Sequence, residues 1–172
     1  MLFRSTVRNN LIIAHGMHEQ QSGNGIHCWN CDSMKIYNNQ VSGHRDGIYF
    51  EFVKNSLIKE NHSFKNLRYG LHFMFSNDDN YENNMFNNNG AGVAVMFSKK
   101  VNMYYNSFLD NWGDASYGIL LKEISDGKIE HNTFKANTTG IYMEGTSRIT
   151  MSKNNFLKDR KSTRLNSSHT DI

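Results

Sequence analysis

One short phrase recurs six times along this chain of 172 residues: a glycine followed by a small, alternating apolar run. The six glycines are separated by 22, 23, 22, 26 and 22 residues, and an asparagine stands fourteen residues after each of them. A fixed period with a fixed internal phase indicates one structural unit stacked on itself. The phrases are Gly25–Trp29, Gly47–Glu51, Gly70–Met74, Gly92–Met96, Gly118–Lys122 and Gly140–Glu144, and the asparagines are Asn39, Asn61, Asn84, Asn106, Asn132 and Asn154.

Apolar columns within the unit predict three short strands. The first and third residues after each glycine are apolar, which is typical of a strand with one buried face. Further columns 11 and 16 residues after the glycine indicate two more strands. A leucine-rich repeat would need a leucine ladder and a helical segment in every unit, and the sequence offers neither. We therefore predict an all-β fold, a right-handed parallel β-helix of about six coils of ~22 residues, with the asparagines laddered at one corner.

The two ends of the sequence depart from the repeat in different ways. The pattern is already running at Met1, without a signal peptide or a capping unit, so we expect residues 1–158 to be a β-helix fragment without end caps. The pattern stops at Lys158, and Asp159–His169 resemble the translation of a sequencing-adapter oligonucleotide. We expect residues 159–172 to be a non-native, disordered tail.

Composition says little about partners. The formal net charge of +3 argues neither for nor against a nucleic-acid partner. The basic residues form no stripe interleaved with aromatic ones, so we expect no nucleic-acid partner. The chain contains no proline, which suits closely stacked coils that need every backbone N–H group.

Two insertions lengthen the same corner of the unit. The gap from a ladder asparagine to the next glycine is normally 8 or 9 residues, but it is 15 from Asn10 to Gly25 and 12 from Asn106 to Gly118. Insertions in solenoids often mark the binding edge, although a tolerated loop would look the same. The residues that we assign to a partner or cargo edge at this corner are His15, Met17, His18, His44, Arg45, Asp46, Arg68, Trp112 and Tyr117.

Two arginines of this edge should lie one above the other. Arg45 and Arg68 each stand two residues before a glycine, so the repeat places them in neighbouring coils. Like charges at that separation repel, unless Asp46 or a bound anion lies between them.

The outward face of the first strand is more apolar than a solvated face needs to be, which indicates a covered surface. His72 and Met74 share this face, and Met96 should stack on Met74 in the next coil. Imidazole and thioether groups suit a soft ion, so these three residues form a candidate site for transient Cu(I), with no firmly bound cofactor expected. Simple mutual covering is the alternative. The other residues that we expect on the exposed face are His27, Trp29, Tyr49 and Glu51.

Cys28 and Cys31 form a Cys-x-x-Cys motif. In a straight strand their Cα atoms would be about 10 Å apart, too far for a disulfide. Only a sharp bend at Asn30 would bring them together. We expect Cys28 to be a buried hydrophobe, and there is no second pair to complete a zinc site.

Seven stretches of the chain include specific non-core residues that shared β-helix periodicity does not require. They are Gly25–Trp29, Ser42–Phe52, Asn66–Ser76, Asn89–Ser98, Asp110–Asp114, Tyr117–Lys122 and Gly140–Thr146. These stretches closely resemble the NosD family of nitrous-oxide-reductase accessory proteins. The resemblance implies a periplasmic right-handed β-helix, not catalytic in its own right, that helps to mature the copper–sulfide centre of nitrous-oxide reductase. The implied partners are an ABC-type ATPase, a membrane permease, a copper chaperone and the reductase itself.

Two other functions remain open. A polysaccharide lyase or hydrolase on a β-helix needs paired carboxylates, or carboxylates with calcium and a basic residue, on neighbouring exposed positions. In this repeat Glu51 falls between Trp29 and Met74, and no two carboxylates stack in the exposed columns. A purely structural or adhesive solenoid is the other alternative.

Overall fold

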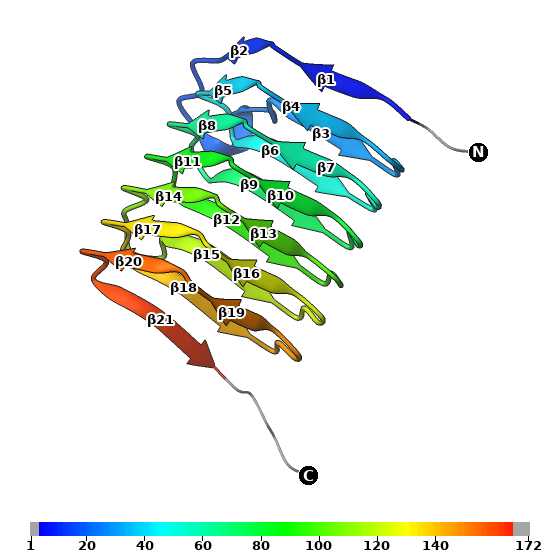
Figure 1. Cartoon of the computed structure of the whole chain (residues 1–172). Helices are drawn as coiled ribbons and strands as arrows, with labels where there is room; N and C mark the ends of the chain where they lie inside the picture. The colour runs from blue at the N-terminus through cyan, green and yellow to red at the C-terminus, as the bar shows by residue number, and fades with distance from the viewer. Residues whose placement is uncertain (1–3, 167–172) are drawn as a thin grey trace.

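Each repeat unit folds into one coil of a right-handed parallel β-helix, as the computed structural model in Figure 1 shows. The structure describes residues 4–166. Successive coils stack along one axis, and the N- and C-terminal ends of the described chain lie at opposite ends of the stack (Figure 1). The predicted fold class is confirmed.

Three parallel sheets of seven strands run along the stack, each taking one strand from every coil. Sheet C, which follows the glycines, contains β3 (Ile26–Trp29), β6 (Asp46–Glu51), β9 (Tyr69–Met74), β12 (Ala91–Met96), β15 (Tyr117–Lys122), β18 (Thr139–Glu144) and β21 (Lys161–Asn166). Sheet A contains β1 (Thr6–Arg8), β4 (Lys35–Tyr37), β7 (Leu57–Lys59), β10 (Asn80–Glu82), β13 (Asn102–Tyr104), β16 (Lys128–Glu130) and β19 (Thr150–Ser152). Sheet B contains β2 (Leu11–Ile13), β5 (Gln40–Ser42), β8 (His62–Phe64), β11 (Met85–Asn87), β14 (Ser107–Leu109), β17 (Thr133–Lys135) and β20 (Asn155–Leu157).

The predicted asparagine ladder joins the coils at the corner between sheets A and B. The backbone nitrogen and the Nδ2 of Asn39 both donate to Oδ1 of Asn61, at 3.1 and 2.9 Å. Nδ2 of Asn61 also donates to the carbonyl oxygen of Ile36, at 2.9 Å. The same pattern repeats down to Asn154. These bonds satisfy polar groups that would otherwise be buried without partners.

A second ladder runs along the corner between sheets B and C. Its members donate in the same pattern, and the last one described is an aspartate that accepts from Asn137 at 2.7 and 2.9 Å. The members are Asn66, Asn89, Asn111, Asn137 and Asp159.

Every coil turns through left-handed backbone conformations at equivalent positions. Five residues after the glycine, φ is between 50° and 60° in each coil, at Asn30, Phe52, Phe75, Phe97, Glu123 and Gly145. Such a conformation costs a non-glycine residue about 1–2 kcal/mol. The turn residues donate backbone hydrogen bonds to the next coil, such as Phe52 N to the carbonyl oxygen of Met74 at 3.2 Å, and these bonds offset that cost.

The interior is filled by stacked apolar columns. Phe86, Phe108, Phe134 and Phe156 stack on one another with ring centroids 4.8–5.5 Å apart. Cys28 lies in the neighbouring column and is 5% exposed, so its prediction as a buried residue is confirmed.

One acidic side chain interrupts this apolar interior. Asp79 is fully buried, and its Oδ1 accepts a hydrogen bond from the backbone nitrogen of Ser56 at 2.8 Å. Its Oδ2 and the hydroxyl of Tyr81 have no hydrogen-bond partner among the described residues. Burial raises the pKa of Asp79 to about 8, so the carboxyl is largely protonated at neutral pH.

The segment after Lys158 pairs with the preceding coil as far as residue 166. Residues 161–166 form β21, which pairs with β18 in register, Thr139 opposite Lys161 and Ile141 opposite Thr163. Asp159 joins the second ladder. These contacts continue the pairing of sheet C and the second ladder beyond Lys158. The disorder and the non-native origin of residues 159–172 and the boundary at residue 158 stay predictions, and residues 167–172 lie outside the described part.

Replacement of Gly70 by alanine should destabilise the stack. A Cβ atom there would lie 2.7 Å from the carbonyl oxygen of Gly92 and 2.8 Å from Nδ2 of Asn89, so the next coil would have to move. We expect a loss of about 1–3 kcal/mol in the free energy of unfolding, measured with urea. Gly23→Ala is the control, because a Cβ there meets nothing within 4 Å. Equal effects of the two substitutions would contradict close stacking at the glycine column.

Asp79 should make the fold less stable as the pH rises. Above about pH 4 the carboxyl is ionised in the unfolded chain, whereas in the folded chain it keeps its proton up to about pH 8. The unfolded state therefore binds fewer protons across this window, and stability falls with rising pH by up to about 1.4 kcal/mol per unit. Urea unfolding at several pH values should show a smaller decline for Asp79→Asn. An identical slope in both proteins would show that Asp79 is ionised in the fold.

Candidate functional site

Both insertions project from the corner between sheets B and C. The first insertion, residues 14–24, follows β2 and contains the 3₁₀ helix η1 (Glu19–Gln21). It bonds to the second coil through Gly16 N and Gly43 O, at 2.8 Å, and Glu19 reaches to 3.6 Å from Arg68 in the third coil. The second insertion, residues 110–116, precedes β15 and bonds to the next coil through Gly113 N and Thr138 Oγ1, at 3.1 Å.

The carboxylate of Asp46 lies between the two arginines of this edge. Arg68 binds it with two hydrogen bonds, Nε to Oδ1 at 2.9 Å and Nη2 to Oδ2 at 2.6 Å. Nε of Arg45 lies 3.8 Å from the same carboxylate. Burial of Asp46 favours its neutral form, but the hydrogen bonds from His72 and Arg68 outweigh burial and hold the pKa of Asp46 below its usual value. Of the two arrangements that the sequence left open, the structure has the internal ion pair.

His72 faces outward from sheet C, but it is only 5% exposed. Its Nδ1 lies 3.2 Å from Nη2 of Arg68 and 3.4 Å from Oδ2 of Asp46. The rings of Tyr49 and Tyr69 pack against the imidazole, with centroid distances of 5.0 and 4.9 Å. Nε2 of His72 is buried and has no hydrogen-bond partner in the described part of the chain. His72 is therefore covered by its neighbours rather than displayed.

The two methionines of the candidate metal site do lie side by side. Met74 and Met96 are directly paired between β9 and β12, and both are partly exposed. The hydroxyl of Tyr49 lies 4.0 Å from Sδ of Met74. Between residues 4 and 166, no three side chains of the His, Cys, Asp and Glu types are arranged to hold a metal ion.

The remainder of the outward face varies in exposure. Trp29 is 63% exposed, and His27 is also exposed and packs edge-on against Tyr49, with centroids 4.8 Å apart. Tyr49 and Glu51 are partly buried, and Glu51 pairs in register with Trp29. At the far end of the face, Tyr117 packs against Tyr142 with centroids 5.1 Å apart.

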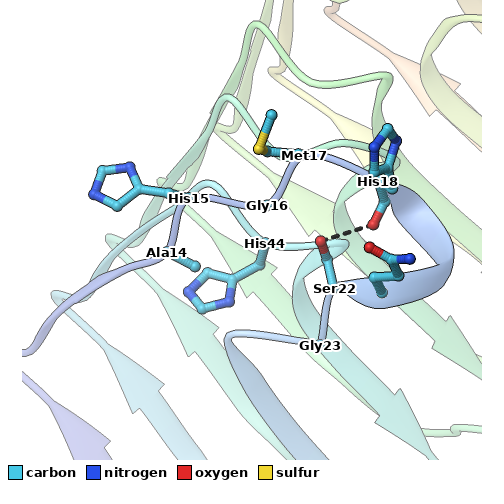
Figure 2. A pocket seen from close by; sticks show the side chains of 9 residues that line it. Ala14, His15, Gly16, Met17, His18, Ser22, Gly23 and His44 are labelled. Atoms are coloured by element: carbon cyan, nitrogen blue, oxygen red, sulfur yellow. Dashed lines mark hydrogen bonds between the residues drawn. The ribbon is translucent and has the colours of Figure 1, made fainter.

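The first insertion encloses an open cavity of about 560 Å³ beside His44 (Figure 2). Figure 2 shows His15 and His18 on opposite sides of the loop, so these imidazoles do not converge. Met17 is 84% exposed, and Trp112 of the second insertion is 61% exposed. Burial lowers the pKa of His44. The residues lining the cavity are Ala14, His15, Gly16, Met17, His18, Gln21, Ser22, Gly23 and His44.

The set of edge residues predicted from the sequence left out two members of this surface, Tyr69 and Glu19. The ring of Tyr69 lies beneath the guanidinium of Arg68, 4.8 Å from its centroid, and also covers His72. Its position directly before a glycine matches that of Tyr117, which was the available signal. Glu19 could not be found in this way, because its position depends on the path of an insertion that has no counterpart in the other coils.

The fold and this surface define a β-solenoid with one elaborated edge: two insertions flank the outward face of a single sheet. Over residues 5–171, the chain matches the family described as periplasmic copper-binding protein (NosD), and it belongs to that family. No curated protein matches it in sequence. Within residues 4–166, no helix has the length and apolarity needed to cross a membrane.

Solved structures share the fold at low sequence identity. The A-module of the mannuronan C-5 epimerase AlgE4 of Azotobacter vinelandii is 15% identical with a TM-score of 0.63, and the match covers 98% of this chain and 56% of that one. A variant of the periplasmic alginate epimerase AlgG is 18% identical with a TM-score of 0.66, covering 95% and 46%. The surface adhesin PfbA of Streptococcus pneumoniae is 16% identical with a TM-score of 0.56, covering 95% and 46%. The chain thus spans about half the length of these structures.

Replacement of Arg68 by methionine should be strongly destabilising, because it leaves the buried Asp46 carboxylate without its main partner. We expect a loss of about 3–5 kcal/mol in the free energy of unfolding at neutral pH. The low pKa of Asp46 means that the pair stabilises the fold above the usual carboxyl pKa and that this contribution disappears as the pH falls, so the difference should shrink in acid.

Arg148→Met is the matched control. Arg148 also binds a carboxylate of the preceding coil with two hydrogen bonds, to Asp126 at 2.6 and 2.9 Å, but that pair is exposed. Exposed pairs contribute little to stability, so urea unfolding should barely change. Equal losses for both variants would show that the burial of Asp46 is not what makes its pairing important.

Proposed function

We propose that this chain is the β-helical part of a non-catalytic periplasmic accessory protein that helps to mature the copper–sulfide centre of nitrous-oxide reductase. Its partners in this role are an ABC-type ATPase with its membrane permease, a copper chaperone and the reductase. The observation that carries the proposal is the match over residues 5–171 to a family described as periplasmic and copper-binding.

The surface proposed for this work is the elaborated edge together with the outward face of sheet C. Arg45, Trp112 and the first insertion would contact a protein partner there. Trp112 and Met17 are strongly exposed apolar side chains, which are a common feature of docking surfaces. Asp46 and Arg68 neutralise each other and would hold the surface in shape.

Met74 and Met96 are the proposed thioether ligands for Cu(I), with Nε2 of His72 as a third donor. Thioethers and imidazole suit a soft monovalent ion, and they bind it less tightly than a pair of thiolates does. If Nδ1 of His72 donates to Oδ2 of Asp46, 3.4 Å away, Nε2 carries no proton and can bind an ion, as in many metal-binding histidines that a carboxylate orients. Such a site fits transient handling of cargo rather than a firmly bound cofactor.

Substitution of both methionines by leucine should weaken Cu(I) binding by the purified chain. Leucine conserves volume and apolarity but lacks sulfur, so the fold should persist while two of three donors are lost. Even removal of an outer partner of a metal ligand costs roughly tenfold in affinity, and we expect at least that loss. The measurement is competition with a chromophoric Cu(I) chelator under anaerobic conditions.

Met85→Leu is the control, because Met85 is also exposed but lies on sheet B, away from this face. Absence of any Cu(I) binding by the unsubstituted chain would contradict the copper role itself. Binding that survives the double substitution would contradict only the methionine site.

The partner role is tested by pull-down of the detergent-solubilised transporter, which Arg45→Ala and Trp112→Ala should weaken without unfolding the chain.

A carbohydrate-active enzyme is the alternative that the sequence left open. The likeness to the epimerases is one of fold, at 15% and 18% identity. On the outward face, Nζ of Lys122 lies 3.4 Å from Glu144, and Glu51 pairs in register with Trp29 and Met74. Neither carboxylate has a second one beside it in its column, so we retain the accessory role.

A further inference from the structure

The two cysteines of the chain lie on either side of a sharp turn. Cys28 is in β3, and Asn30, two residues on, has φ of +51°, in the left-handed region. A straight strand would separate the two residues, but this turn directs both side chains toward the same end of the core. Cys28 is 5% exposed, and Cys31 is partly buried and packs against the same apolar cluster.

The same two positions of other coils show that this arrangement belongs to the repeat. In the second coil they are Phe50 and Val53, and in the fifth they are Leu121 and Ile124, and all four are buried core residues. The inward direction of the pair is therefore set by the coil geometry. Only the first of the described coils places two thiols there.

The two thiols differ in accessibility. Burial raises the pKa of Cys28 to about 12, and the nearby Cys31 adds to the rise. Cys31 lies on the solvent side, and its Sγ donates to the carbonyl oxygen of Trp29 at 3.3 Å. An accessible thiol beside a buried one is the arrangement needed for stepwise exchange with an external disulfide.

We propose that Cys28 and Cys31 form a redox-active dithiol, which closes to an intramolecular disulfide by exchange with a small-molecule or protein disulfide. The thiolate of Cys31 attacks one sulfur of the incoming disulfide, and the other sulfur leaves as a thiolate and takes up a proton. Cys28 then loses its proton to solvent and attacks Sγ of Cys31, which releases the second external thiolate. Overall, two protein thiols are oxidised to one disulfide, and the external disulfide is reduced to two thiols.

This chemistry suits the compartment of the family. The periplasm is oxidising, and disulfides form and persist there. The oxidised pair would join β3 to the segment that follows the Asn30 turn, next to the exposed indole of Trp29. The proposal requires no metal and is independent of the copper role.

The test is a redox titration of the purified, reduced chain in glutathione buffers of increasing oxidised fraction. Samples are quenched in acid, unfolded and alkylated, and the mass of the intact protein is then measured by mass spectrometry. We expect both thiols to become resistant to alkylation together, in one two-electron step, with no glutathione adduct accumulating at the end point.

Single substitutions separate the roles of the two residues. Cys28→Ser should trap glutathione on Cys31, because no second thiol remains to release it. Cys31→Ser should leave Cys28 unmodified in the folded chain and alkylated only after unfolding. The proposal is overturned if both thiols of the unsubstituted chain stay reactive in the most oxidising buffer, or if they are lost only to glutathione adducts or to disulfides between chains. If either variant fails to fold, the redox titration of the unsubstituted chain decides the question by itself.

Discussion

The hydrogen bonds between stacked asparagine amides hold one coil in register with the next, and the arrangement of every other column depends on them. Because Oδ1 of Asn61 accepts from both the backbone and the side chain of Asn39, neither coil can slide or rotate without losing both bonds. A slip of one residue would exchange the inward and outward faces of the strands. Strict register is what brings Arg45, Asp46 and Arg68 together from consecutive coils, and what stacks Met96 on Met74.

Repeat architecture also explains why the candidate site consists of residues that differ from the repeat. Most positions carry the residue type that stacking of the coils requires, so a position with a different residue type is free to serve another purpose. The two insertions leave the corner between sheets B and C without disturbing either sheet, because each returns to the same column of glycines. A solenoid can thus carry an elaborated edge while its core remains regular.

The sequence allowed prediction of the fold because its signals are periodic: the glycine column, the apolar columns and the Asn39 ladder are each confirmed. The burial of His72 could not be predicted, since alternation assigns a side chain to a face but does not show what covers that face. Tyr69 lies in β9 at a position that recurs in the repeat, whereas Glu19 lies in an insertion that does not repeat, so only Tyr69 could be found from the pattern. The turn at Asn30 was also hidden, because equivalent turns use residues as unlike as phenylalanine and glutamate.

The two ladders also have a direction. In both of them each Oδ1 faces the preceding coil and accepts from the backbone N–H and the Nδ2 of the ladder residue there. The two faces of a coil therefore differ, because one carries ladder acceptors and the other carries the donors that bind the next coil. Asp159 places a carboxyl oxygen where the N–H groups of Asn137 converge, much as an acidic residue does at the start of a helix. A coil could not be turned over within the stack and still make these bonds.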